Sequence, residues 1–268
     1  ETVYGLAGNA YSDRACKKIF KLKKRPKNNP LIVHYSNIKN LAKDCNLNSN
    51  FYKLYKKFCP GPITFILELK KKSKISKFVT NGKNTLAVRF PKHPITRNLL
   101  NKLIFPLAAP SANISSKLSA VCSSDVKEEF GKKIKYILEG GKSTIGLEST
   151  IIDLRSAPKI LRLGGLEISH IQKVLKKKII VVESPQKITS PGQFKLHYSP
   201  DMPIRLNVKK NKPSEAFLLI RKKKQNEPNY YYLSKKGNLK EAAKNLFSML
   251  RKIKKSKYKS IAVAKIPN

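Results

Sequence analysis

Cationic and polar side chains follow several short apolar runs of this sequence, where ligand-binding groups are often placed. Lys23 and Arg25 come at the end of a predicted helix, and Arg89 closes a short apolar run. Ser111 and Asn113 follow another such run. Strand ends in α/β proteins commonly carry the groups that contact a ligand, and guanidinium groups bind carboxylates and phosphates through two oxygens at once. These residue types indicate an anion-binding site.

Each position also has an ordinary structural explanation. Lys23 and Arg25 suit a helix C-terminus, because cations complement the helix macrodipole there. Ser111 and Asn113 suit a turn, because their side chains bond local backbone. An arginine at a strand end is by default a surface residue, and His34, at the end of an apolar run, is more often a satisfied core or edge histidine than a ligand. Taken singly, these residues do not decide between a site and a surface.

The most obvious phosphate-binding candidate is the Gly-Gly-Lys-Ser-Thr segment at 140–144. A P-loop needs a glycine at position 136, and Tyr136 occupies it. The chain also lacks the G-x-G-x-x-G, H-E-x-x-H and G-x-S-x-G patterns. A nucleotide would therefore have to be held by a different arrangement.

The charge is strongly positive: 57 lysines and arginines against 16 acidic residues give a formal net charge of +41. Such an excess favours polyanionic partners such as nucleic acid. The lysines are spread over both halves of the chain beside many asparagines, which an AT-rich coding bias would also produce. Both explanations stay open, with a generic basic surface preferred.

The cysteines indicate the compartment. The four of them show no C-x-x-C pair, as expected of reduced cytosolic thiols, and they predict neither a disulfide framework nor a metal site. No stretch approaches the roughly 20 apolar residues of a membrane span, and no export signal opens the chain. We expect a cytoplasmic protein.

Apolar periodicity predicts the elements that position these residues. Short apolar runs alternate with segments of helical period, which is typical of α/β or α+β proteins. Helices are predicted after Ser12 or Asp13 and over 51–58. Strands are predicted over 30–35, 63–69, 85–90, 107–110, 136–139, 149–154 and 159–163.

A change in composition near Glu183 divides the chain. Residues 184–203 form a proline-punctuated linker between a large domain, 1–183, and a small one, 204–268. The small domain is predicted to be a β-β-α-β unit with a mostly parallel sheet. Its strands are expected over 216–220, 230–234 and 260–266, with a helix from Asn238.

Several motifs, taken in order and spacing, resemble the successive motifs of the YrdC-like threonylcarbamoyl-AMP synthase family in its long form. They lie at 1–6, 23–26, 29–34, 60–64, 87–91, 108–113, 146–153 and 160–162. The segments 190–193 and 197–200 resemble the linker that joins this domain to a small C-terminal domain, although 193–196 departs from the usual Met-Lys-Tyr-Arg. The chain looks like a fragment that lacks the N-terminal strand of its first domain and the C-terminus of its second.

The resemblance implies a fold and an activity. The fold is a large twisted mixed sheet with a smaller Rossmann-like domain. The activity is nucleotidyl transfer: L-threonine, bicarbonate and ATP give L-threonylcarbamoyladenylate and pyrophosphate, and the product supplies threonylcarbamoyladenosine modification of tRNA. The implied partners are the tRNA-modification proteins that use this product, and tRNA itself through the basic surface.

The resemblance also implies roles for particular residues. No covalent nucleophile is expected; Lys23, Arg25 and Arg89 would position substrates and stabilise charge, and Mg²⁺ is expected to accompany ATP. L-Threonine or its carbamate would contact Thr2, His34, Arg89, Ala109 and Ser149. ATP would contact Lys23, Arg25, Asn29, Thr85, Ser111, Asn113, Ser119, Arg162, His197 and Tyr198.

Two other functions are compatible with the sequence. A non-catalytic basic RNA-binding protein with a YrdC-like fold is the main alternative, and it would show steep salt dependence without ATP turnover. A carbamoyl transferase with a YrdC-like module is the other. Such proteins carry zinc-finger-like and acylphosphatase-like segments, which this chain does not show.

Overall fold

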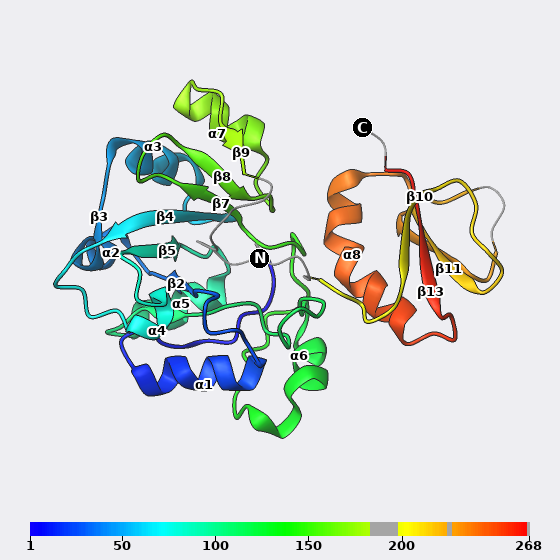
Figure 1. Ribbon diagram of the computed structural model, residues 1–268, viewed down its shortest axis with the longest axis horizontal. Coiled ribbons are helices and arrows are strands. Elements are labelled where there is room, and N and C mark those ends of the chain that lie inside the picture. The colour runs from blue at the N-terminus through cyan, green and yellow to red at the C-terminus, as the bar shows by residue number, and fades with distance from the viewer. Residues whose placement is uncertain (183–197, 224–226, 267–268) are drawn as a thin grey trace.

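The computed structural model describes residues 1–182, 198–223 and 227–266, which form two lobes (Figure 1). The first lobe is built on a nine-stranded sheet in the order β1-β6-β2-β5-β4-β7-β8-β9, with β3 paired to β4. Parallel and antiparallel pairs occur together, so the predicted mixed sheet is confirmed. Its strands are β1 (Gly8–Asn9), β2 (Ile32–His34), β3 (Cys45–Asn46), β4 (Ile63–Leu69), β5 (Thr85–Arg89), β6 (Leu107–Ala108), β7 (Thr150–Asp153), β8 (Lys159–Arg162) and β9 (Ile180–Val181).

Successive residues of the central strands point to opposite faces of this sheet, because side chains alternate along a strand. One face packs into the main core, which includes Val33, Phe65 and Val88. Residues of several helices join that core, so the helices cover this face. The helices of the lobe are α1 (Asp13–Lys23), α2 (Ile38–Asp44), α3 (Ser49–Phe58), α4 (Lys77–Thr80), α5 (Pro94–Lys102), α6 (Ser123–Phe130) and α7 (Ile168–Leu175).

Among the described residues, the opposite face carries a small apolar cluster, formed by Ile32, Ile66, Ala87, Ile151 and Leu161. We call this the open face, because no helical residue of the described chain belongs to that cluster. Polar residues predicted for the site lie two positions farther along the same strands, as His34 does after Ile32 and Arg89 after Ala87.

Helix α1 begins at the Ser12 cap that the sequence predicts and ends at Lys23, a predicted site residue. The Ser12 side chain accepts a hydrogen bond from the Ala15 amide, a cap worth about 1 kcal/mol. Lys24 adopts a left-handed conformation at the C-terminus, with φ of 49°. The helix therefore stops just after Lys23, which is buried although it is a lysine.

The second lobe contains a four-stranded sheet in the order β10-β13-β11-β12, in which every pair is parallel. Its elements are β10 (Ile204–Val208), β11 (Glu215–Arg221), β12 (Tyr230–Ser234), α8 (Leu239–Lys254) and β13 (Ser260–Ala264). Asn238 caps α8, as its position in the sequence suggests. The parallel sheet and the helix are confirmed.

Two predictions about strands were incomplete or wrong. Strand β10 was missed, although its apolar residues alternate with polar ones as in a strand with one solvated face; Leu206 is 67% exposed. The strand predicted over 136–139 is wrong: this segment is irregular loop, with Tyr136 77% exposed. Its short apolar run finds no partner strand among the described residues. Leu138 is exposed, while Ile137 packs against the cluster that contains Val126 and Phe130. Most of the predicted linker, 184–197, lies outside the described residues.

The two lobes share one hydrophobic cluster. Leu118 and Val121 of the first lobe pack with Phe247, Leu250 and Ile253 of α8. Figure 1 shows α8 on the side of the second lobe that faces the first. None of the helices in the described chain is long and apolar enough to cross a bilayer.

Candidate active site

Strand register brings the predicted site residues together on the open face. His34 of β2 lies opposite Arg89 of β5, and Thr64 of β4 lies opposite Arg89 on its other side. Ile32 and Ala87 form the next pair on the same face. Since β2 and β5 are parallel, His34 and Arg89 both stand at the carboxyl end of their strands.

Arg89 is held by three groups and is not the surface residue that a strand end would give by default; it is 7% exposed. Its Nη1 atom donates to Thr2 Oγ1 at 2.7 Å, and its Nε donates to the Gly61 carbonyl at 3.3 Å. Its Nη2 forms an ion pair with the Glu1 carboxylate, which also accepts from the Lys92 amide at 3.2 Å. Burial, the largest single influence, raises the pKa of Glu1, but Arg89, the chain's terminal ammonium and the Lys92 amide together lower it below its usual value. Arg89 is therefore oriented and charge-balanced.

Ser149 lies beside this group. Its hydroxyl is 2.6 Å from Thr64 Oγ1 and accepts from Arg162 Nη2 at 3.2 Å. Arg162 also donates from Nη2 to the Ser149 carbonyl at 2.8 Å. Ala109 continues β6 along β2 through its amide, which donates to the Ile32 carbonyl at 2.9 Å. The structure thus places Thr2, His34, Arg89, Ala109 and Ser149 on the open face or next to it.

His34 is neutral in this environment. Burial and the positive charge of Arg89 lower the pKa of His34 to about 3. Its Nδ1 atom is enclosed and has no hydrogen-bond partner in the described part of the chain. A core histidine with a purely structural role would not leave this nitrogen unpaired, so the structure favours His34 as a ligand-binding residue.

Lys23 belongs to the residues predicted to contact ATP. It is 1% exposed, and its ammonium donates to the Ser111 carbonyl at 2.6 Å and to the Asn113 carbonyl. Burial, and then the charge of Arg25, lower the pKa of Lys23 to about 7. This buried cation is held by neutral carbonyl groups.

Arg25 is bound in the same way. Its Nη2 donates to Asn29 Oδ1 at 2.6 Å and to the Pro30 carbonyl at 2.7 Å, and its Nε donates to the Asn29 carbonyl at 3.0 Å. Burial and the charge of Arg162 lower the pKa of Arg25 to about 9, so it stays protonated at neutral pH. Arg25 thus acts on Lys23, and Arg162 acts on Arg25. No carboxylate of a described residue is hydrogen-bonded to any of the three, although Glu129 and Glu148 attract the Lys23 ammonium from farther away.

Asn113 and Ser119 lie on the loop that follows β6. Asn113 Nδ2 donates to the Ile114 and Lys117 carbonyls, both at 2.8 Å, while its buried Oδ1 accepts from no described residue. The Ser119 hydroxyl donates to the Glu148 carboxylate. An enclosed, unpaired amide oxygen offers an acceptor to a ligand N–H or O–H group.

Thr85, which is predicted to contact ATP, lies some distance along the sheet from the residues predicted to bind L-threonine. It starts β5, four residues before Arg89 and on the same face, which corresponds to roughly 13 Å of extended strand. Asn29 and Pro30 precede β2, which is parallel to β5, so they lie toward the same end as Thr85. Most residues predicted for ATP therefore lie toward the opposite end of the strands from those predicted for threonine. Arg162 is the exception, because it bonds to Ser149 and lies opposite Ile151, at the level of Arg89.

Of the two linker residues predicted to bind ATP, His197 lies outside the described residues and Tyr198 within them. The Tyr198 ring packs on Phe247 of α8 with 5.2 Å between ring centroids. Burial and the nearby Glu148 carboxylate raise the pKa of Tyr198 well above its usual value. Tyr198 thus lies between the two lobes, next to the residue that binds Ser119.

Sequence reasoning missed the two carboxylates of the site, Glu1 and Glu148. Both lie within motifs that were recognised, and each is a rare acidic residue in a chain with a net charge of +41. That contrast is the signal that could have found them. No group of three or more His, Cys, Asp or Glu side chains suited to a metal ion occurs in the described segments.

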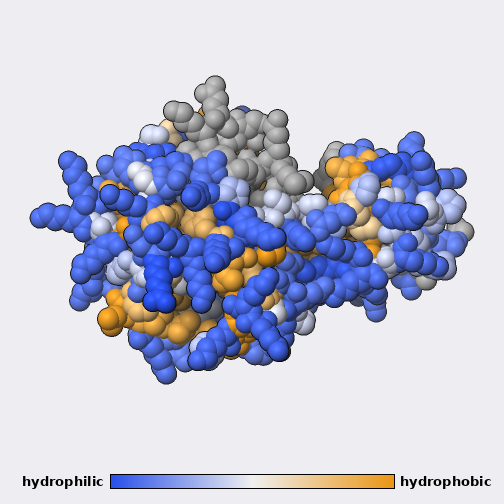
Figure 2. Space-filling view, turned by 60° about the horizontal axis from the view of Figure 1, so that its bottom comes forward, coloured by the Kyte–Doolittle hydropathy of each residue, from blue (hydrophilic) through white to orange (hydrophobic). Residues whose placement is uncertain are grey.

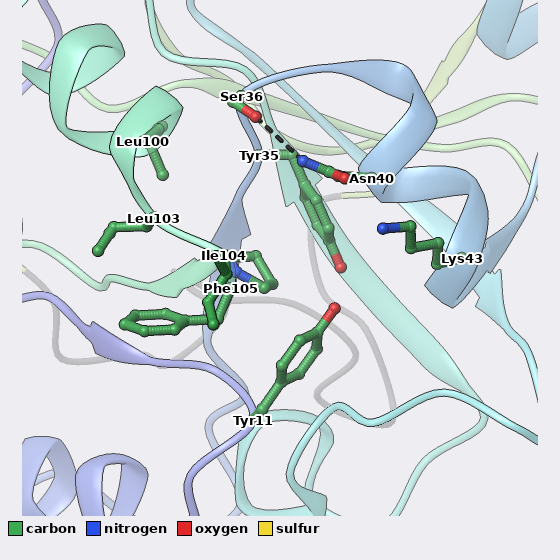
Figure 3. A pocket seen from close by; sticks show the side chains of 10 residues that line it. Tyr11, Tyr35, Ser36, Asn40, Lys43, Leu100, Leu103, Ile104 and Phe105 are labelled. Atoms are coloured by element: carbon green, nitrogen blue, oxygen red, sulfur yellow. Dashed lines mark hydrogen bonds between the residues drawn. The ribbon is translucent and has the colours of Figure 1, made fainter.

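A small cavity of about 20 Å³ lies elsewhere in the first lobe (Figure 3). Tyr11 and Tyr35 point toward each other in it, and both hydroxyls donate to Asp44 Oδ2, at 3.0 and 2.9 Å. None of the predicted site residues lines it. Its volume suits a single water molecule rather than a substrate.

Known proteins resemble the chain over its whole length. The Sua5/YciO/YrdC family model, described as telomere recombination, matches residues 1–164, and the model of the threonylcarbamoyl-AMP synthase C-terminal domain matches residues 166–268. The threonylcarbamoyl-AMP synthase of Pyrococcus abyssi is 40% identical over 212 residues, which are 76% of this chain and 61% of that protein. The enzyme of that name from Schizosaccharomyces pombe is 35% identical over 276 residues, or 91% of this chain and 65% of that protein.

The structural comparison agrees with these matches. The crystal structure of P. abyssi Sua5 complexed with L-threonine has a TM-score of 0.90 at 32% identity, covering 100% of this chain and 84% of that one. The chain spans somewhat less than two thirds of the length of the two curated relatives. With both family models and the two-lobed fold in agreement, the chain belongs to the Sua5/YciO/YrdC family.

Proposed function

We propose that this protein is a threonylcarbamoyl-AMP synthase, which converts L-threonine, bicarbonate and ATP into L-threonylcarbamoyladenylate and pyrophosphate. The observation that carries the proposal is the division of the open face into two ends. One end presents an oriented arginine beside a neutral histidine. The other presents a buried lysine and a half-buried arginine whose hydrogen bonds to described residues all go to neutral oxygen atoms. A small amino acid and a polyphosphate would fit these two ends respectively.

Arg89 would bind the carboxylate of threonine. Its guanidinium already has its orientation fixed by Glu1 and Thr2. Because the Thr2 hydroxyl accepts from Arg89, its own proton can be donated to the ligand. The P. abyssi relative, whose crystal structure contains L-threonine, supports this assignment.

Lys23, Arg25 and Arg162 would bind the phosphates of ATP. Lys23 is buried, Arg25 and Arg162 are half-buried, and none of the three is hydrogen-bonded to a carboxylate among the described residues. Phosphate oxygens would form charge-assisted bonds to them. Asn113 Oδ1, enclosed and unpaired, would accept from the nucleoside. Thr85, Asn29, Ser111 and Ser119 would complete that end of the site, and we extend the proposal to His197 and Tyr198.

The transfer step needs no protein nucleophile. Threonine and bicarbonate first give the carbamate with loss of water. A carbamate oxygen then forms a bond to the α-phosphorus of ATP, and the bond from that phosphorus to the oxygen bridging the β-phosphate breaks as pyrophosphate leaves. The residues of this chain would hold the two anions in line and offset the charge that builds up on the phosphates.

Mg²⁺ would arrive with ATP. Glu1 and Glu148, the carboxylates nearest the site, are already bonded to Arg89 and Ser119. The described residues therefore do not form a cage of carboxylates, and the ion would be held mainly by phosphates and water, as is common for Mg²⁺.

The product would serve tRNA modification, and its users would be tRNA-modification proteins in the cytoplasm. The net charge of +41 supports a direct contact with tRNA. Figure 2 shows hydrophilic side chains over most of one face, with apolar patches between them. The same surface would suit a protein that only binds RNA, so the two functions must be separated by turnover.

Pyrophosphate release from ATP tests the proposal, with L-threonine and bicarbonate each present or omitted. We expect release that requires both, and its loss in Arg89→Ala. Arg155→Ala provides the matched control, because Arg155 forms a comparable ion pair with Asp153 that the site does not use. Absence of release from folded protein that binds tRNA would overturn the synthase and favour the RNA-binding alternative.

A further inference from the structure

A buried arginine of the second lobe reaches into the first. Arg251 lies on α8 and is 8% exposed. Its Nη2 donates to the Leu118 carbonyl at 2.7 Å and to Glu129 Oε1 at 3.1 Å, and its Nε lies 3.8 Å from Asp125 Oδ2. Both carboxylates belong to α6, so one side chain joins the two lobes through three groups.

These carboxylates also hold the loop between β6 and α6 at two points. Glu129 Oε2 accepts from the Ile114 amide at 3.2 Å, and Asp125 Oδ2 accepts from the Val121 amide at 2.8 Å. We call residues 113–121 the nucleotide loop, because it carries Asn113 and Ser119. Arg251 therefore contacts the loop directly at Leu118 and indirectly at both ends.

The second lobe contacts the nucleotide loop at another point. The Ser199 amide donates to the Ser116 carbonyl at 2.8 Å, and Asp201 lies 3.4 Å from the Lys117 ammonium while it also pairs with Lys254 of α8. These residues lie just before the second sheet. The loop is thus bordered by the second lobe along its length.

The neighbouring site loop is pressed against α8 as well. Gly146 has a φ of +75°, and a Cβ atom placed on it would lie 2.5 Å from the Lys244 carbonyl oxygen. Gly146 begins the segment that continues to Glu148 and Ser149. Two loops that carry predicted substrate contacts therefore rest on the same helix of the second lobe.

We infer that Arg251 is a positioning residue through which the second lobe fixes the nucleotide loop and completes the ATP end of the site. Its contacts are with the backbone and carboxylates that shape the loop, and none of them is with a predicted ATP ligand's side chain. Without the guanidinium, Asp125 and Glu129 would be two largely buried carboxylates, one helical turn apart, that keep their backbone amide partners but lose their shared cation. Their repulsion and the lost Leu118 bond would loosen the loop. The assignment to ATP rests on the proposed function.

Arg251→Gln tests the inference in the full protein, with Arg205→Gln as its control. Arg205 pairs with Glu215 inside the second lobe, away from the first. We expect Arg251→Gln to raise the KM for ATP by roughly tenfold to a hundredfold, because small displacements of binding groups have effects of that order. The KM for threonine should stay within about twofold. Arg251→Lys should restore part of the loss, and Arg205→Gln should change neither KM.

Hydrogen exchange gives a readout that does not depend on turnover. Amides of the nucleotide loop should exchange faster in Arg251→Gln than in the control, while those of β4 and β5 should not. Unchanged exchange and an unchanged KM for ATP would overturn the inference, and so would equal effects on both substrates. A wild-type protein that releases no pyrophosphate would instead count against the proposed function, and the exchange experiment would still test the positioning role.

Discussion

The two ends of the open face hold their cations in different ways. At the threonine end, Arg89 has a carboxylate partner in Glu1 and is charge-balanced before any ligand arrives. At the nucleotide end, the hydrogen bonds of Lys23 and Arg25 to described residues go to carbonyl and amide oxygens, and the carboxylates that act on Lys23 do so without a hydrogen bond. The comparison shows that one end is preorganised by an ion pair, whereas the other is left with excess positive charge that a polyphosphate would neutralise.

If this comparison is correct, the largest effect comes from removing a cation of the nucleotide end. Arg25→Ala should lower kcat/KM for ATP by about a hundredfold to a thousandfold, as the loss of a transition-state donor does. The measurement is pyrophosphate release as a function of ATP concentration. Arg25→Lys, which keeps the charge but loses the three-bond fork, should recover part of the activity. Loss confined to threonine binding would contradict the division of the two ends.

At the threonine end, a smaller effect is expected from a change that keeps the charge. Arg89→Lys loses the planar fork that bonds Thr2 and Glu1, and it should raise the KM for threonine by roughly tenfold to fiftyfold. The KM for ATP should change much less. Glu1→Gln is the companion variant, because it removes the ion pair and leaves the fork. An equal rise of both KM values would show that the two ends are not independent.

The comparison also predicts a pH dependence that only the nucleotide end should show. The pKa of Lys23 is lowered to about 7 by burial from an ordinary value of 10.5. ATP phosphates would raise that pKa again, so binding takes up a proton and ATP affinity should fall as pH rises above about 7. Calorimetry in buffers of different ionisation enthalpy measures how many protons are taken up when ATP binds. Lys23→Met should take up no proton, and a wild-type protein that behaves like Lys23→Met would refute the prediction.

Lys23 should also make the free energy of unfolding depend on pH. Between pH about 7 and 10.5, Lys23 binds a proton in the unfolded chain and not in the folded one. The free energy of unfolding should therefore increase with pH over this range, and below it the contribution should be constant. Urea unfolding of wild type and Lys23→Met at several pH values isolates this contribution. A difference between the two proteins that does not vary with pH would count against it.

The smallest effect concerns the surface rather than either end. Raising salt from about 0.05 to 0.3 M should weaken ATP binding only severalfold, because exposed lysines are screened over about 10 Å while the buried cations are not. Titrations at several salt concentrations measure the slope. If tRNA binding is present, it should weaken far more steeply than ATP binding over the same range.

Much of the fold was predictable, because local patterns agree with the final packing. The apolar runs over 63–69 and 85–90 predicted β4 and β5, and the Ser12 and Asn238 caps marked the starts of α1 and α8. Where the pattern is short or partner-dependent, prediction failed. The run at 136–139 has no neighbouring strand, and β10 becomes a strand only through its pairing with β13.

The sequence predicted which residues form the site better than it predicted the interactions that hold them in place. Ordered motifs placed Arg89, Lys23 and Ser149 together without showing what holds them. The Glu1 partner of Arg89 and the Glu148 partner of Ser119 come from segments far away in the sequence, so only the tertiary structure reveals them. The role inferred for Arg251 could not be predicted either, since it depends on how the second lobe meets the first.

Strand β10 has a consequence for the protein in solution. It lies at one border of the described second sheet, with Ile204 41% and Leu206 67% exposed, and its outer backbone groups are open to pairing. Such borders invite two molecules to join strand to strand. Around it the chain is densely cationic, with 19 lysines and arginines against four acidic residues over 201–268. Mutual repulsion between these lobes would oppose self-association in dilute buffer, and added salt would weaken that protection, so colloidal stability and ionic strength are linked through this one strand.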